Sequence, residues 1–232
     1  MDFGADRIAF AAAVIFAVLE FAPVVFASLG LFFLSRLVDR LDPGSGRMAK
    51  VAWALVTLGT LSHATWRLAF AVFRVDISPL STALLVFAAP GLVLLSAGMV
   101  RSWAAVCGRK IRQDPWLAPI GFGWLGLLGA FYLHDSMAGD TWRWPLLALA
   151  VMGSATMSLA AAALGWRLRL HMAAALFAFN VAVALALLGV AMIPSHPLLL
   201  QYPLEALHAG SEAAFAFAAW RVAVEYQAPA PA

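Results

Sequence analysis

Apolar stretches of about twenty residues recur along the chain, with short polar connections between them. A helix needs about 20 mostly apolar residues to cross a hydrocarbon core of about 30 Å. Since lipid offers no hydrogen-bond partners to the backbone, each stretch is predicted to be helical. The predicted spans are residues 8–35, 49–73, 79–100, 115–133, 144–165, 170–192 and 199–222. The sequence thus predicts an all-α, seven-helix transmembrane domain at residues 1–226 and a disordered tail at 227–232.

The composition supports a membrane protein. Of the 232 residues, 64% are hydrophobic and 12% are charged, whereas roughly 25% are charged in ordinary soluble domains. The first apolar stretch has no basic flank and is too long for a signal sequence, so we expect it to remain as the first span. The single cysteine, Cys107, excludes a disulfide within the chain and a multi-cysteine metal cluster.

Lysine and arginine residues gather in alternate connections and so orient the predicted bundle. Eleven follow the first, third and fifth spans or lie near the C-terminus, whereas three lie in the other connections or near the N-terminus. By the positive-inside rule, the N-terminus is outside and the C-terminus is cytoplasmic. We therefore expect a multi-pass protein of a bacterial-type inner membrane. Because the basic residues form no single patch, we predict no nucleic-acid binding.

Several ionisable residues fall inside predicted spans, where such groups usually face the protein interior and have a partner. At a rise of about 1.5 Å per residue, Glu20, His63 and Glu212 lie within about 3 Å of the span midpoints. His208 lies about 5 Å toward the outer side. A lipid-facing charge at this depth costs about 2.5 to 3.5 kcal/mol, so we expect the four side chains to converge inside the bundle. This would place the seventh span beside both the first and the second.

Three further polar residues lie near this predicted cluster. Arg67 is the only lysine or arginine more than one residue from the end of a predicted span, and at roughly 9 Å from the midplane it is level with Glu205, a possible ion-pair partner. Asn180 is predicted near the centre of the sixth span, where its amide could hold a ligand. Pro23 cannot donate to the carbonyl of Leu19, so a kink is expected beside Glu20.

One interpretation of the cluster is a metal centre. His63, His208 and Glu212 could bind Zn²⁺, because two imidazoles and a carboxylate form a common catalytic ligand set that leaves a position for water. Glu20 would then be the candidate general base, which would make the protein a metal-dependent hydrolase.

With these residues the chain resembles the seven-span intramembrane hydrolase superfamily that includes alkaline ceramidases and progestin/adiponectin-receptor proteins. Those families place Ser and His on span two and His-x-x-x-His on span seven around zinc, and the ceramidases add a Glu on span one. The corresponding residues here are Ser62-His63, His208-x-x-x-Glu212 and Glu20. The resemblance implies hydrolysis of a lipid or small hydrophobic substrate. The chain departs from the pattern in Glu212, in the adjacency of Ser62 and His63, and in having no Asp within span three.

Three alternatives remain open from the sequence. His63 and His208 could be axial ligands of haem b in an electron carrier or sensor. Arg67 would then pair with a haem propionate, and Arg67 and Asn180 would be the cofactor-binding residues. The glutamates and histidines could relay protons or a small cation in a transporter. The cluster could also be a structural polar network without a ligand, in which Arg67 neutralises Glu20 or Glu212 and the histidines hydrogen-bond to these carboxylates. A retinal Schiff base is excluded, since the only lysines, Lys50 and Lys110, lie in connections.

Overall fold

The structure is a computed structural model that describes residues 3–109, 111, 113–136, 140–191 and 198–226. Every regular element in these ranges is helical, in agreement with the all-α prediction. The predicted disordered tail at 227–232 lies outside them. The elements are α1 (Phe3–Leu19), α2 (Phe21–Leu41), α3 (Pro43–Phe73), α4 (Ser78–Val106), α5 (Leu117–Ser136), the 3₁₀ turn η1 (Asp140–Trp142), α6 (Arg143–Arg167), α7 (His171–Ala191) and α8 (Leu198–Glu225).

Five helical segments are long and apolar enough to cross a membrane. They are Ala13–Leu41, Ser78–Val106, Leu117–His134, Arg143–Arg167 and His171–Val190. The chain is therefore a helical membrane protein. Of the seven predicted spans, these five segments have the length and composition to cross a membrane. Helices α3 and α8 are not among them because they carry five of the six ionisable residues of the predicted cluster, which lower their mean hydropathy.

The connection after the first span is shorter than predicted. The sequence suggested a polar connection over residues 36–48, but α2 continues to Leu41 and α3 begins at Pro43, so that Asp42 alone joins them. Proline is well suited to the first turn of a helix because that position needs no backbone donor. The polar residues nearby lie on helix surfaces instead, where Lys50 Nζ pairs with Asp39 at 2.8 Å.

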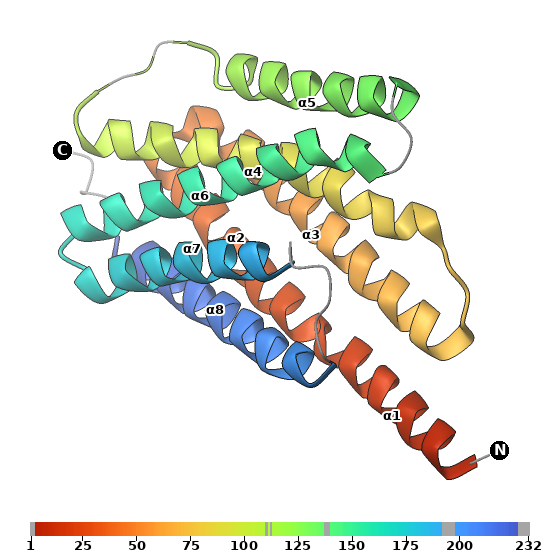
Figure 1. Cartoon of the computed structure of the whole chain (residues 1–232). Helices are drawn as coiled ribbons and strands as arrows, with labels where there is room; N and C mark the ends of the chain where they lie inside the picture. The colour runs from red at the N-terminus through yellow and green to blue at the C-terminus, as the bar shows by residue number, and fades with distance from the viewer. Residues whose placement is uncertain (1–2, 110, 112, 137–139, 192–197, 227–232) are drawn as a thin grey trace.

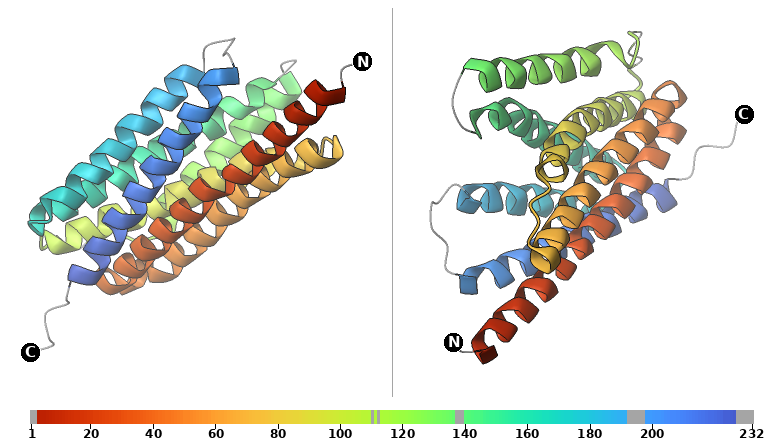
Figure 2. Two further views of the ribbon diagram at one scale, coloured as in Figure 1. Left: turned by 90° about the horizontal axis from the view of Figure 1, so that it is seen from below. Right: turned by 90° about the vertical axis from the view of Figure 1, so that its right-hand side faces the viewer.

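Six helices form a closed ring. Helix α2 packs between α3 and α8, α4 packs between α3 and α6, and α7 joins α6 to α8. Segments from opposite ends of the sequence thus lie side by side where α2 meets α8 (Figures 1 and 2). Helix α5 lies outside the ring against α4 and α6, at the top of Figure 1. Helix α1 continues beyond the ring and leans on α3.

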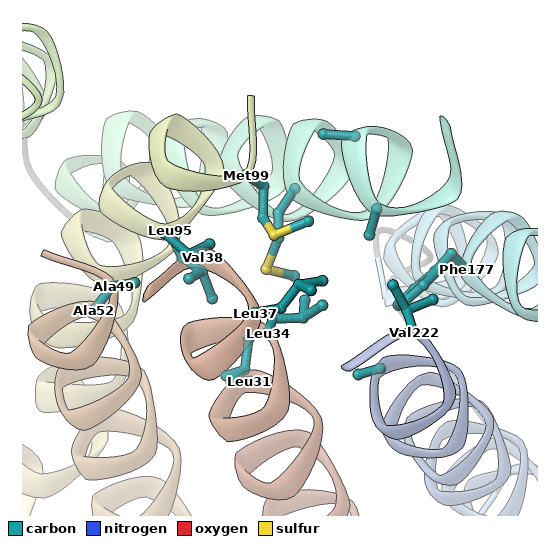
Figure 3. Close-up of a cluster of buried hydrophobic side chains, with 14 of the residues drawn as sticks. Leu31, Leu34, Leu37, Val38, Ala49, Ala52, Leu95, Met99, Phe177 and Val222 are labelled. Atoms are coloured by element: carbon teal, nitrogen blue, oxygen red, sulfur yellow. The ribbon is translucent and has the colours of Figure 1, made fainter. Parts of the chain in front are cut away.

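The two ends of the ring are named here by the chain termini. The N-side holds α1, the connection from α3 to α4, and the beginnings of α6 and α8, whereas the C-side holds the α2–α3 turn, the α6–α7 connection and the end of α8 (Figure 1). The C-side half has a continuous apolar core. Its fully buried side chains include Leu34, Leu37, Val38, Met48, Leu95, Met99, Phe177 and Val222 (Figure 3).

The α2–α3 turn is tied to α4 by a polar network around Asp42. Its Oδ2 atom accepts hydrogen bonds from Ser45 Oγ at 2.7 Å and from Arg101 Nε at 2.9 Å. Arg101 also donates from Nη1 to the carbonyl of Gln113 at 2.9 Å. Burial by itself would raise the pKa of Asp42, but the hydrogen bonds from Ser45 and Arg101 and the Arg101 charge outweigh it and lower the pKa below its ordinary value.

We expect this carboxylate to make stability depend on pH. Because the pKa of Asp42 is lower in the folded protein than in the unfolded chain, its contribution is complete above the ordinary pKa of about 3.9 and is lost as the pH falls through the folded-state value. In Asp42→Asn the free energy of unfolding should be lower at pH 7 and should fall less between pH 5 and pH 3. Denaturant titrations at each pH measure this. Equal pH slopes for Asp42→Asn and the wild type would contradict it.

Candidate functional site

The regular helix is interrupted at Glu20, as Pro23 predicted. Helix α1 ends at Leu19 and α2 begins at Phe21. Since Pro23 has no backbone N–H, the carbonyl of Leu19 lacks its usual partner four residues later. Glu20 itself is only 7% exposed, so the carboxylate is held inside the protein beside this interruption.

Arg67 of α3 is the ion-pair partner of Glu20. Its Nη1 atom donates a hydrogen bond to Glu20 Oε1, and its guanidinium also lies over the ring of Phe16, 5.9 Å from the centroid. The Arg67 side chain is 39% exposed, whereas the Glu20 side chain is 8% exposed. The arginine therefore extends from the surface of α3 to neutralise a buried carboxylate at the junction of the neighbouring helices α1 and α2.

Helix α8 presents one imidazole between two carboxylates. His208 Nδ1 lies 3.8 Å from Glu205 Oε2, and His208 Nε2 lies 3.8 Å from Glu212 Oε1. The spacings of three and four residues place all three side chains on one face of the helix. The two nitrogens of His208 thus face a carboxylate each, in an ion-pair geometry that holds when the ring is protonated.

Asn180 and His63 complete the polar groups. Asn180 of α7 is buried and donates from Nδ2 to Ser211 Oγ of α8 at 2.9 Å. His63 of α3 has its ring centroid 5.4 Å from that of Trp66. Its Nδ1 atom is buried and has no hydrogen-bond partner. A buried polar atom without a partner is uncommon and usually marks a site for water or a ligand.

The structure brings these groups to one cavity inside the ring. Its volume is about 410 Å³, and every helix of the ring contributes to its lining. All six sequence candidates line it: Glu20, His63, Arg67, Asn180, His208 and Glu212. The apolar part of the lining includes Leu31, Val56, Leu92, Met157 and Phe215. The cavity is thus polar on the N-side and apolar toward the C-side core.

The described residues do not form a metal centre. Among the described residues, no three His, Cys, Asp or Glu side chains lie close enough together to hold a metal ion. His208 and Glu212 approach from α8 and His63 from α3, with the cavity between these helices. Glu20, the candidate general base, is bonded to Arg67. We therefore derive no catalytic step through zinc, and the zinc, haem and hydrolase interpretations stay predictions.

One expectation about neighbours is wrong and another is confirmed in part. The sequence placed the seventh span beside the first and the second, but α8 packs on α2 and α7, and α2 stands between α8 and α3. The sequence offered Glu20, Glu212 or Glu205 as a partner for Arg67, and the hydrogen bond of Arg67 goes to Glu20, while Glu205 lies beside His208. Depth along a span fixes one coordinate only and does not give the order of helices around the ring.

Three polar lining residues, Glu205, Ser154 and Thr60, were not among the sequence candidates for the site. Glu205 was treated only as a partner for Arg67, although its three-residue spacing from His208 already placed both on one helix face. Ser154 of α6 also lines the cavity. A lone serine in an apolar helix gives no signal in the sequence that would distinguish it from a packing residue.

Comparisons with protein families, with characterised proteins and with solved structures found no match for the chain.

Proposed function

We propose that this protein binds a small amphipathic molecule within the membrane, in the partly open cavity lined by the six helices of the ring. The observation that supports this most is the cavity of about 410 Å³ with ionisable side chains on one wall and apolar side chains on the others. Ligand sites in proteins have volumes of about 300 to 1,000 Å³, and most of them combine an apolar lining with a few convergent polar groups.

The C-side core favours binding over ion transport. A route through the ring would have to pass the buried layer that includes Leu37, Met48, Met99 and Phe177, each with no exposed surface. Ions and protons cross membranes along polar groups or water, and this layer offers apolar side chains. A molecule with a polar head and an apolar tail, in contrast, matches both parts of the cavity.

The proposal includes seven spans in a bacterial-type inner membrane, with the N-side outside. Helices α3 and α8 have 31 and 28 residues, more than the ~20 needed to cross. The ionisable residues in the middle of these helices line the cavity, which turns part of each side chain away from lipid. The orientation follows from the eleven basic residues at the C-side connections and the three at the N-side.

Reporter fusions test this topology. A reporter fused after Asp42 should be cytoplasmic, and one fused after Asp76 should be outside, because α3 crosses between them. A fusion after Gly108 should again be cytoplasmic. Alkaline phosphatase and a cytoplasmically active fluorescent protein give opposite readouts at each position. Fusions after Asp42 and Asp76 on the same side would show that α3 does not cross.

Binding is tested with three eight-carbon probes, octylamine, octanoate and 1-octanol, titrated calorimetrically into the protein in lipid nanodiscs. We expect at least one probe to give saturable heat that empty nanodiscs lack. Ala64→Phe should abolish it, because Ala64 is 2% exposed and lines the cavity. Ala54→Phe, on an exposed part of α3, is the matched control and should bind as the wild type does.

The absence of saturable binding for all three probes would overturn the proposal. Ala88→Phe, at a second buried lining position, provides the same test if Ala64→Phe fails to fold. Metal analysis and the visible spectrum of the same sample address the earlier predictions. Stoichiometric zinc would support the hydrolase, and a Soret band would support haem.

A further inference from the structure

The polar wall of the cavity contains more negative than positive groups. Glu20, Glu205 and Glu212 all line it, and Arg67 is the only lysine or arginine among the described residues that do. Ionised carboxylates only accept hydrogen bonds, whereas a guanidinium only donates them. Arg67 and Glu20 neutralise each other through their ion pair. The charge that remains is therefore set by the α8 face and His63.

On the side of α8 that lines the cavity, one imidazole lies between two carboxylates. A protonated His208 can carry a single positive charge, while Glu205 and Glu212 lie 3.8 Å away on either side of its ring. With all three carboxylates ionised and His208 protonated, three negative charges face two positive charges, those of Arg67 and His208. An unbalanced charge inside a membrane is costly unless a counter-charge accompanies it.

His63 does not supply the missing charge. Its buried Nδ1 atom has no hydrogen-bond partner. In a protonated ring both nitrogens carry a hydrogen, and Nδ1 would then be a buried donor without an acceptor, which is costly. In the neutral ring with the hydrogen on Nε2, Nδ1 is instead an acceptor. Like the carboxylates, it can then accept a hydrogen bond from a ligand.

Other polar groups on the wall have used part of their donors. Asn180 donates from Nδ2 to Ser211 and also hydrogen-bonds Glu212, which leaves its carbonyl oxygen as an acceptor. Thr60 donates its hydroxyl hydrogen to the carbonyl of Val56 on the preceding turn, at 3.0 Å. The Ser154 hydroxyl and the other N–H groups of Arg67 are the remaining donors among these residues. When all three carboxylates are ionised, the described wall keeps acceptors for a further donor and has one negative charge without a counter-charge.

We propose that the ligand is a protonated primary amine with a short hydrocarbon tail, an inference that rests on the binding function proposed above. An ammonium group has three N–H donors, no acceptor and one positive charge, which complements this wall. The tail lies against the apolar lining that includes Leu31, Leu92 and Phe215. With about 30 Å³ for each water-sized group, 410 Å³ holds roughly fourteen heavy atoms, enough for a tail of about eight to ten carbons.

The three eight-carbon probes separate this inference from the binding function itself. They share the tail and differ in a cationic, anionic or neutral head. At pH 7 in nanodiscs we expect octylamine to bind at least about tenfold more tightly than 1-octanol, the difference given by one or two charge-assisted hydrogen bonds, and octanoate to bind most weakly. Tighter or equal binding of octanoate or 1-octanol would overturn the amine assignment while leaving the binding function in place.

Substitution of one carboxylate tests the head-group contact directly. Glu212→Gln keeps the shape of the side chain and removes its charge, so octylamine affinity should fall by about tenfold or more while 1-octanol affinity stays the same. Glu225→Gln is the control, because Glu225 is exposed near the C-side end of α8 and pairs with Arg221. An equal loss for both probes in Glu212→Gln would mean that this residue shapes the cavity, and would overturn the proposed contact.

Discussion

Arg67→Met is expected to destabilise the protein by about 2 kcal/mol or more. Removal of one partner from a fully buried ion pair typically costs about 3 to 5 kcal/mol, since the other charge stays buried without compensation. Here Glu20 is almost completely buried, while 39% of the Arg67 side chain is exposed, so we expect a value below that range. The free energy of unfolding in mixed detergent micelles measures it.

The double variant Glu20→Gln, Arg67→Met distinguishes this cause from lost packing. Because it removes the stranded carboxylate as well, it should recover most of the stability lost in Arg67→Met. Arg47→Met is the matched control on the same helix, since Arg47 is exposed, and it should change stability by less than about 0.5 kcal/mol. A double variant as unstable as Arg67→Met would show that the ion pair is not the reason.

Gly153→Ala is expected to destabilise the protein by about 1 to 3 kcal/mol, the usual cost of overpacking. A Cβ atom on Gly153 would lie 2.9 Å from the carbonyl carbon of Leu92 and 3.0 Å from the backbone nitrogen of Val93. These are backbone atoms, which cannot rotate away as a side chain can. Helices α4 and α6 would have to separate at a point where Leu92 also lines the cavity.

Gly121→Ala is the matched control for this substitution. Gly121 lies in α5, and a Cβ atom added there would have nothing within 4 Å. Alanine also has the higher helix propensity, so stability should stay the same or rise by up to roughly 1 kcal/mol. Thermal unfolding followed by circular dichroism compares the two variants. Similar losses for both would mean that close approach of α4 and α6 is not what Gly153 provides.

The sequence predicted the helices well because their signals are local. Hydrophobic length identified the helices, five of whose segments are long and apolar enough to span a membrane, and Pro23 identified the interruption beside Glu20. The bounds were less accurate at the C-side. Arg36, Arg40 and Arg47 suggested a polar connection, but long basic side chains can lie on the surface of a helix and reach the interface while the helix continues.

The candidate site was predictable as a set of residues and not as a set of contacts. The high cost of lipid-facing charge indicated that Glu20, His63, His208 and Glu212 would converge, and all four line the cavity, although 44% of the His208 side chain is exposed. Their partners depend on the order and rotation of the helices. That order results from long-range packing, such as the position of α2 between α3 and α8. The spacing of residues within one span gives no information about such packing.

The closure of the ring by α8 against α2 has a consequence for biogenesis. Helices emerge from the ribosome in chain order, so the Glu20–Arg67 pair can form as soon as α3 is inserted. The remaining ionisable residues of the polar wall on α8, Glu205, His208 and Glu212, are synthesised after the other five helices of the ring. Until then α2 has no partner on the face that later packs on α8. Nascent chains halted before α8 should therefore lack a complete cavity, with ligand capture possible only once α8 has been inserted.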